Sequence, residues 1–99
     1  SAKRSAELPE VPTLIEAGLA GFDMTTWYAV YVTAGSPPEV VAKLQAELAR
    51  IVALPDVQAR LRGLGGEPGG MTVEQFTRYN AQEYERFGRL IREAGIKPE

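Results

Sequence analysis

The residue types that carry most hydrolytic and metal chemistry are missing from this sequence. It contains neither histidine nor cysteine in 99 residues. Catalytic serines and cysteines are commonly activated by a histidine, and protein zinc sites are mostly built from histidine and cysteine. We therefore expect no nucleophilic hydrolase, no metal site, and no thiol or disulfide chemistry.

The acidic residues do not form a pair that is suited to acid–base catalysis. The candidate pairs, Glu83 with Glu85 and Glu10 with Glu16, stand among polar neighbours. A general acid needs a buried carboxyl, whereas a solvated surface explains these glutamates more simply. We expect no catalytic residue and no cofactor, so the chain is predicted not to be an enzyme.

Two groups of residues have the composition of anion-binding sites. The stretch Gly63 to Gly70 is rich in glycine, but no Lys-Ser or Lys-Thr pair follows it, so a turn explains it better than a phosphate loop. Arg86, Arg89 and Arg92 are interspersed with glutamates, which indicates a mixed solvated helix face. With a net charge of −2, the chain also lacks the basic face that nucleic acids require, and we expect no nucleic-acid partner.

Three aromatic residues, Trp27, Tyr28 and Tyr31, are able to stack on a sugar or a nucleobase. They stand, however, in a run from Phe22 to Thr33 that is rich in aromatic and β-branched residues. Such runs are typical of strands that are covered on both faces, and Trp27 to Val32 is the continuous apolar part. We predict a central strand here, with the aromatic rings in the core.

The elements that must hold these residues are mostly helical. Apolar residues at helical spacing predict one helix from Val40 to Ala53 and another from Val73 to Ala94. Pro55 separates the first of these from a short helix that begins near Asp56 and ends at Gly63. We expect the two long helices to pack their apolar faces around the strand.

Three predicted helix starts carry a capping box, in which two side chains exchange hydrogen bonds with the backbone of the first turn. In the second box, Pro37 is expected at the first helical position, to which its fixed φ is suited. The three pairs are Thr13 with Glu16, Ser36 with Glu39, and Thr72 with Gln75.

Glycines mark the predicted helix ends. The first helix should last one or two turns, because Gly18 and Gly21 follow it. Gly95 predicts a left-handed cap at the end of the last helix, and Pro98 prevents its continuation. Residues 67–70 predict a connector or, alternatively, a short edge strand.

The composition is that of an ordinary soluble domain, with 44% apolar and 24% charged residues. A chain of this length holds one small domain. A single strand, however, leaves backbone N–H and C=O groups unpaired on both edges and is not stable without neighbours. We therefore expect a fragment of a larger sheet, and we expect the isolated chain to self-associate.

A series of short motifs runs through nearly the whole chain in a fixed order. It consists of Leu-Pro-Glu-Val-Pro-Thr at 8–13, Glu-Ala-Gly at 16–18, Gly-Phe-Asp at 21–23, Trp-Tyr at 27–28, Ala-Gly-Ser-Pro at 34–37, Pro-Asp-Val at 55–57, Gly-Glu-Pro at 66–68 and Ala-Gly-Ile-Lys at 94–97. Each motif alone is weak, but their order and spacing resemble the late portion of tripartite tricarboxylate transporter receptors, often called the Bug family.

The resemblance implies an α/β fold, the two-lobed class II periplasmic-binding-protein fold. This chain would be its C-terminal fragment, mostly helical with one central strand. Residues 1–24 would form the end of the second lobe and the hinge segment, and residues 25–99 the C-terminal part of the first lobe. The implied function is the capture of a small carboxylate solute in the periplasm and its delivery to the membrane permease subunits. The glycine-rich loops with which this family holds carboxylates are not in this sequence.

The same resemblance places Thr25, Thr26 and Trp27 nearest to the cleft between the lobes. Their hydroxyl groups and indole N–H are candidate ligand-binding donors, directly or through a water. The alternative is that the three residues shape the hinge and pack. A rival interpretation of the whole chain is a free-standing helical module that dimerises through Trp27 to Val32.

Overall fold

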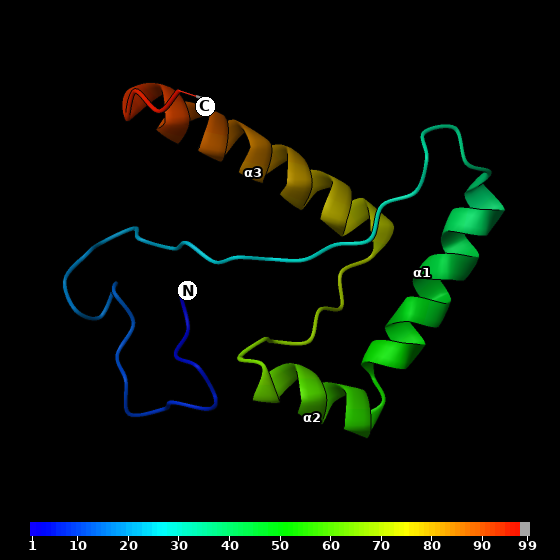
Figure 1. Cartoon of the computed structure of the whole chain (residues 1–99), viewed down its shortest axis with the longest axis horizontal. Coiled ribbons are helices and arrows are strands. Elements are labelled where there is room, and N and C mark those ends of the chain that lie inside the picture. Colours follow the sequence, from blue (N-terminus) through cyan, green and yellow to red (C-terminus); the bar gives the residue numbers. More distant parts are fainter. Residues whose placement is uncertain (98–99) are drawn as a thin grey trace.

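Three helices occupy the second half of the chain in the computed structural model, which describes residues 1–97. They are α1 (Pro38–Val52), α2 (Pro55–Gly63) and α3 (Val73–Glu93). Figure 1 shows α1 and α2 meeting at an elbow, while α3 stands apart from both. Both long helices and the short one were predicted, with bounds that differ by one or two residues. The predicted role of Pro98 lies outside the described residues.

The start of α1 differs from the predicted capping box. Pro37 is the N-cap and no side chain caps the helix. The residue before a proline is driven out of the helical region, and Pro37, which precedes Pro38, has an extended ψ of 138°. The helix therefore begins at Pro38, one residue after the first helical position that the capping box predicted. Ser36 instead donates its hydroxyl to the Thr33 carbonyl oxygen at 2.7 Å and closes the preceding turn.

The ends of α3 confirm the predicted signals. The Gln75 N–H donates to Thr72 Oγ1 at 3.2 Å, and the Thr72 N–H donates to Gln75 Oε1 at 2.9 Å. At the other end Gly95 takes a φ of +65°. This left-handed residue lets the Ile96 N–H reach the Ile91 carbonyl oxygen at 3.0 Å, which closes the helix in a Schellman motif.

The capping box at Thr13 forms, but it starts only a hydrogen-bonded turn and no helix. The Glu16 N–H donates to Thr13 Oγ1 at 3.1 Å, and the Thr13 N–H donates to Glu16 Oε2 at 2.8 Å. Gly18, with a φ of +104°, reverses the chain before a second turn is completed. The prediction of a short helix here is therefore wrong, because the segment forms a single hydrogen-bonded turn.

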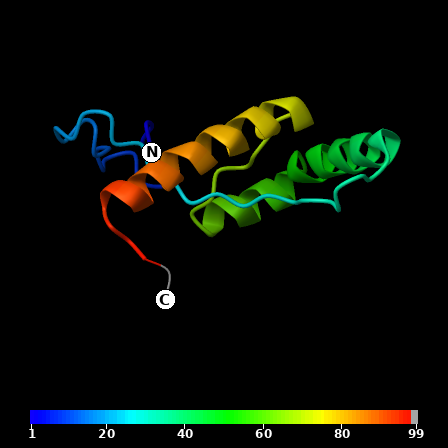
Figure 2. The same ribbon diagram turned by 90° about the horizontal axis from the view of Figure 1, so that it is seen from above.

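The predicted strand is not formed. Residues 22–33 run as an extended segment along α3, as Figure 1 and the turned view in Figure 2 show. Within residues 1–97 no strand is present, and Met24 to Val32 make no backbone–backbone hydrogen bond. A strand requires a neighbouring strand, and the described chain offers none. The same reason applies to residues 67–70, where the alternative of an edge strand is also wrong.

The side chains of this extended segment pack on α3 instead. The Trp27 ring meets the rings of Phe76 and Tyr79 edge-on, with centroids 5.7 and 5.8 Å apart. Tyr31 meets Phe76 in the same way at 5.7 Å, and its hydroxyl donates to Asn80 Oδ1 at 2.9 Å. The prediction that the last helix packs on this segment is confirmed.

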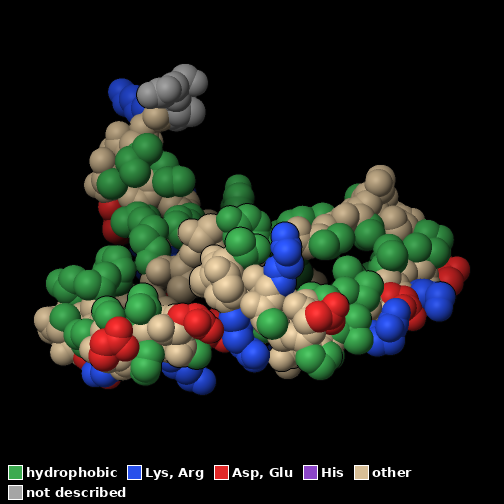
Figure 3. All heavy atoms as spheres, turned by 60° about the horizontal axis from the view of Figure 1, so that its bottom comes forward, with side chains coloured by type: hydrophobic (Ala, Val, Ile, Leu, Met, Phe, Trp, Pro, Cys, Tyr) green, Lys and Arg blue, Asp and Glu red, His purple; other side chains and the backbone are tan. Residues whose placement is uncertain are grey.

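The rest of the apolar surface is open. Among residues 1–97 no hydrophobic side chain is buried, and the radius of gyration is 16.6 Å, against about 13 Å for a compact chain of this length. Hydrophobic side chains are spread over the face shown in Figure 3, with charged groups scattered between them. The expected packing of α1 around the segment is absent, because its apolar positions remain exposed. These positions are Val40, Leu44, Leu48 and Ile51.

Candidate functional site

The three predicted site residues lie together at one open hollow. Thr25, Thr26 and Trp27 line it with Met24 from the same segment and Phe87 from α3, and its volume is about 410 Å³. Both threonines are exposed, whereas Trp27 is half-buried. Only the segment and one face of α3 line the hollow. The side opposite them is open.

The threonine hydroxyl groups are available to a ligand. Within residues 1–97 neither Thr25 nor Thr26 makes a side-chain hydrogen bond. Each hydroxyl is one donor and also accepts hydrogen bonds, so the pair is able to bind a carboxylate or a water that bridges to one. Their contact with a ligand stays a prediction.

The indole N–H of Trp27 has a partner within the chain. Its indole Nε1–H donates to Glu83 Oε2 at 3.4 Å. The indole is a donor only and carries a single N–H, so a solute would have to replace Glu83 as its acceptor. In this structure the Trp27 ring lines the hollow and its N–H joins the segment to α3, while a role as donor to a solute stays a prediction.

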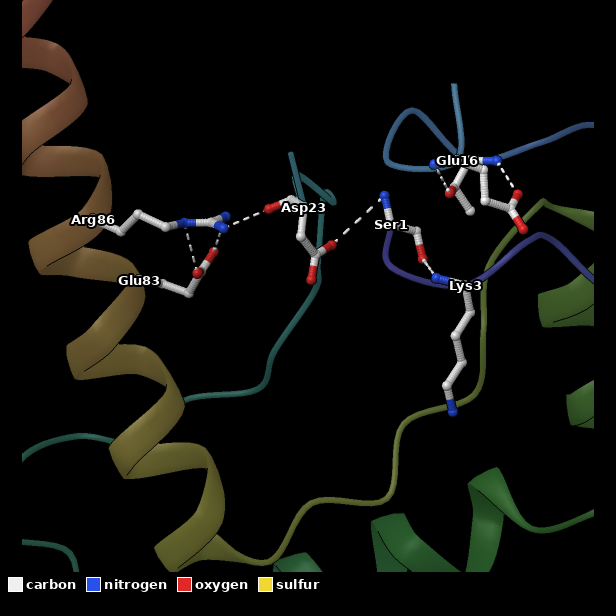
Figure 4. A network of polar contacts seen from close by, with 7 residues as sticks. Ser1, Lys3, Glu16, Asp23, Glu83 and Arg86 are labelled. Atoms are coloured by element: carbon white, nitrogen blue, oxygen red, sulfur yellow. Dashed lines mark hydrogen bonds and ion pairs between the residues drawn. The ribbon is translucent and has the colours of Figure 1, made fainter. Parts of the chain in front are cut away.

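Glu83 is the only buried residue among the described ones, with 7% of its surface exposed. Its carboxylate faces Arg86, one turn later on α3, with Nε to Oε1 and Nη2 to Oε2 both at 3.1 Å. The third nitrogen of the guanidinium, Nη1, donates to the carbonyl oxygen of Asp23. Figure 4 shows this pair projecting from α3 toward Asp23, whose carboxylate lies 3.6 Å from the Ser1 amino group.

The spacing of Glu83 and Arg86 in the sequence indicated this ion pair, but the other charged residues around them favoured a solvated helix face. An acid and a base three residues apart on a helix form a favourable pair, and Glu83 with Arg86 has this spacing. Alternation with other charges pointed to a solvated face, and Arg86 is indeed partly exposed, with 45% of its side chain accessible. The burial of Glu83 depends on Trp27, which is distant in the sequence, and periodicity does not reveal such a contact.

A second polar cluster lies in the first sixteen residues. Arg4 Nε donates to Glu16 Oε2 at 2.8 Å, and the same oxygen accepts the Thr13 N–H. The hydrogen bond from Arg4, followed by that from the Thr13 backbone, lowers the pKa of Glu16 below its ordinary value. This cluster ties the start of the chain to the turn at Thr13 and contributes no residue to the hollow.

Another open hollow, of about 460 Å³, lies beside the first half of α3 and contains no predicted site residue. Arg78 on its rim pairs with Glu74 at 2.8 Å, and both side chains are well exposed. Such solvated pairs contribute little to stability or to recognition. The hollow is lined by Gly70, Met71, Gln75, Arg78, Tyr79 and Gln82.

Two features of the described residues bear on other functions. Residues 1–97 contain no group of three or more acidic side chains close enough to hold a metal ion. None of the three helices combines the length and the apolar character that crossing a bilayer demands.

Comparison with known proteins shows the family of the chain. The family described as tripartite tricarboxylate transporter family receptor matches residues 1–96. The chain belongs to this receptor family. The predicted resemblance is therefore confirmed, and the family is one of transport receptors rather than enzymes.

Individual members of the receptor family match over nearly the whole chain. The UPF0065 protein in the tcbD-tcbE intergenic region of a Pseudomonas species is 42% identical over 92 residues, which are 92% of this chain and 27% of that relative. Protein BugT of Bordetella pertussis is 29% identical over 97 residues, 98% of this chain and 30% of BugT. The chain thus spans less than a third of these two receptors. No solved structure matches the chain.

Proposed function

We propose that this chain is the C-terminal part of an extracytoplasmic receptor that captures a small carboxylate solute for a tripartite tricarboxylate transporter. The single observation that carries the proposal is the family match over residues 1–96. The geometry supports it, because two free threonine hydroxyl groups lie at a hollow that only one side encloses. Small anions bind tightly where several donors converge and water is excluded, which requires a second wall.

The proposal accounts for the exposed surfaces of the chain. Residues 1–24 would belong to the end of the second lobe and the hinge, and residues 25–99 to the C-terminal part of the first lobe. The first-lobe sheet would then pair with the backbone of Met24 to Val32 and cover the apolar face of α1. The receptor would work in the periplasm and deliver its solute to the membrane permease subunits.

The proposal is tested with a chimaera in which this chain replaces the matching 92 residues of the Pseudomonas relative. Thermal unfolding is followed with a panel of small carboxylates, and with the corresponding amides as controls. A ligand that binds only the folded state raises the unfolding temperature. We expect at least one carboxylate to raise it and its amide not to.

Two outcomes contradict the proposal. If the unaltered relative responds to a carboxylate and the folded chimaera does not, this chain does not supply a working part of the site. If neither protein responds to any carboxylate but both respond to a neutral solute, the carboxylate assignment is wrong.

A free-standing dimerisation module is the second candidate. It is favoured by the exposure of Tyr28 and Val30, which are 95% and 69% accessible. An exposed apolar segment with unpaired backbone groups is a template for pairing with another chain. In a module of this kind the chimaera would show no solute response, and association would be the native function of the chain.

A further inference from the structure

We infer that Glu83 and Arg86 act as a clamp that fixes Asp23 and Trp27 on α3 and thereby positions Thr25 and Thr26 at the hollow. Both are positioning residues in this account and neither touches the solute. The part of the inference that concerns Thr25 and Thr26 as ligand contacts rests on the proposed function. The clamp itself rests only on the contacts below.

The clamp holds the segment at two points that are four residues apart. Arg86 Nη1 donates to the Asp23 carbonyl oxygen, and Glu83 Oε2 accepts the Trp27 indole N–H. Both anchors come from a single turn of α3. The three residues between the anchors, 24–26, are those that line the hollow with Trp27 and Phe87.

All three nitrogens of the Arg86 guanidinium have a partner within the chain. Its Nε and Nη2 face the two carboxylate oxygens of Glu83, and its Nη1 is used by the Asp23 carbonyl. Its carbon also lies 5.3 Å from the centroid of the Phe87 ring. The hydrogen bond from Nη2 joins two charged groups, and charge-assisted hydrogen bonds are stronger than neutral ones. Arg86 is therefore a structural link between α3 and the segment.

The clamp differs from the other ion pair on the same helix. Glu74 and Arg78 are 82% and 68% exposed and make no hydrogen bond or ion pair with another segment within residues 1–97, whereas the Glu83 side chain is 9% exposed. Removing one partner of a buried charge pair is far more damaging than removing one of an exposed pair. Glu74 with Arg78 therefore provides a matched control for the loss of charge on α3.

No other polar contact fixes residues 24–26 in the described chain. Met24 to Val32 make no backbone–backbone hydrogen bond, and the next side-chain link is Tyr31 with Asn80. Without the clamp, the two threonines would be held only by the packing of the Trp27 ring. The hydroxyl groups would then sample several positions, and binding would carry the entropy cost of ordering them.

The test uses the 99-residue chain at a concentration at which sedimentation shows a monomer, and it follows the single tryptophan, whose indole N–H gives one resolved NMR signal. We expect Arg86→Gln to speed the exchange of this proton with solvent by roughly five- to tenfold, the factor that corresponds to the loss of one hydrogen bond. Arg86→Lys keeps the charge but cannot bridge both partners, so it should rescue the protection only in part. Arg78→Gln is the matched control and should leave the exchange unchanged.

Equal exchange rates in Arg86→Gln and Arg78→Gln would overturn the clamp, as would a wild-type indole N–H that exchanges like that of free tryptophan. If Arg86→Gln loses its helical circular dichroism, Glu83→Gln carries the test. Its amide oxygen still accepts the indole N–H, but its neutral side chain no longer pairs with Arg86. Exchange faster than in Arg78→Gln then supports the clamp, and equal exchange overturns it.

The link to solute binding is tested separately in the chimaera. Arg86→Gln should weaken carboxylate binding about tenfold, and Arg86→Lys should restore part of it, while Arg78→Gln leaves it unchanged. If the exchange result holds but Arg86→Gln binds like the parent, the clamp stands and its positioning of Thr25 and Thr26 is wrong. If the parent chimaera binds none of the carboxylates, the proposed function is wrong. The clamp is then tested by the exchange experiment alone.

Discussion

Trp27 and Glu83 are 56 residues apart in the sequence, yet the indole N–H of one donates to the carboxylate of the other at 3.4 Å. The tryptophan stands in the most apolar stretch of the chain, and the glutamate stands on a helix face that is rich in charge. Their contact joins the extended segment to α3 and leaves the two threonines beside Trp27 at an open hollow. The local order of the candidate site therefore depends on a polar contact and on a small aromatic cluster.

The turn that ends α3 is expected to require glycine at position 95. Gly95 has a φ of +65°, and a Cβ there would meet no atom within 4 Å. Gly95→Ala should therefore lower stability through backbone strain alone, by about 1–2 kcal/mol. Urea unfolding followed by helical circular dichroism measures the effect.

The matched control on the same helix should change stability in the opposite direction. Gly88 lies inside α3, where an added Cβ would reach only the mobile end of Arg92 at 3.4 Å. Gly88→Ala should raise stability by about 0.5–1 kcal/mol, because alanine loses less backbone entropy in a helix. A shift of the same sign in both variants would contradict the assignment of the α3 terminus.

Arg4 should control the titration of Glu16. The hydrogen bond from Arg4 is the largest cause of the lowered pKa of Glu16, followed by that from the Thr13 backbone. Arg4→Gln should therefore raise the pKa of Glu16 toward its ordinary value, but only in part, since the Thr13 contacts remain. The carboxyl carbon signal of Glu16, followed by NMR during acid titration, reports the change directly.

The sign of the pH dependence follows from the direction of this shift. Because the pKa of Glu16 is lower in the folded chain, its contribution to stability is present above the ordinary glutamate pKa. It is lost as the pH falls through the lower folded value. Lys3→Gln removes a nearby charge that makes no contact with Glu16 and serves as control. An Arg4→Gln titration that overlays the wild-type curve would show that the ion pair does not form.

The isolated chain should associate through the segment from Met24 to Val32. Its backbone groups have no backbone partner within residues 1–97, and no hydrophobic side chain there is buried. Val30→Pro removes one donor and blocks strand pairing, so it should shift the chain toward monomer. Sedimentation velocity at high micromolar concentrations compares the association of the wild-type chain with that of Val30→Pro. A wild-type chain that remains a compact monomer there would refute the prediction.

Local signals predicted the helices well, because their information lies within a few residues. The capping box at Thr72 and the left-handed Gly95 are set by neighbours in the sequence, and both formed as expected. The error at Ser36 was also local: two consecutive prolines exclude the helical conformation at Pro37, and this effect outweighs the capping signal.

The strand and the site were harder to predict, since both depend on residues far away in the sequence. A run of aromatic and β-branched residues identified the apolar segment, but its pairing depends on strands that the described chain does not contain. Thr25, Thr26 and Trp27 lie at one hollow, and their contact with a solute stays a prediction from the family resemblance. The anchoring of Trp27 by Glu83 was not foreseen, because a contact across 56 residues leaves no mark on local spacing.

Titration calorimetry of the 99-residue chain beside the chimaera, with the same panel of small carboxylates, tests the central claim most directly. Thr25 and Thr26 offer the chain two hydroxyl donors, each contributing a net of about 0.5–1.5 kcal/mol, against an association cost of at least about 4 kcal/mol. We predict no saturable binding by the chain with a dissociation constant below about 1 mM, equivalent to about −4 kcal/mol, and saturable binding by the chimaera. Micromolar binding by a monomeric isolated chain would contradict the claim that it supplies only one wall of the site.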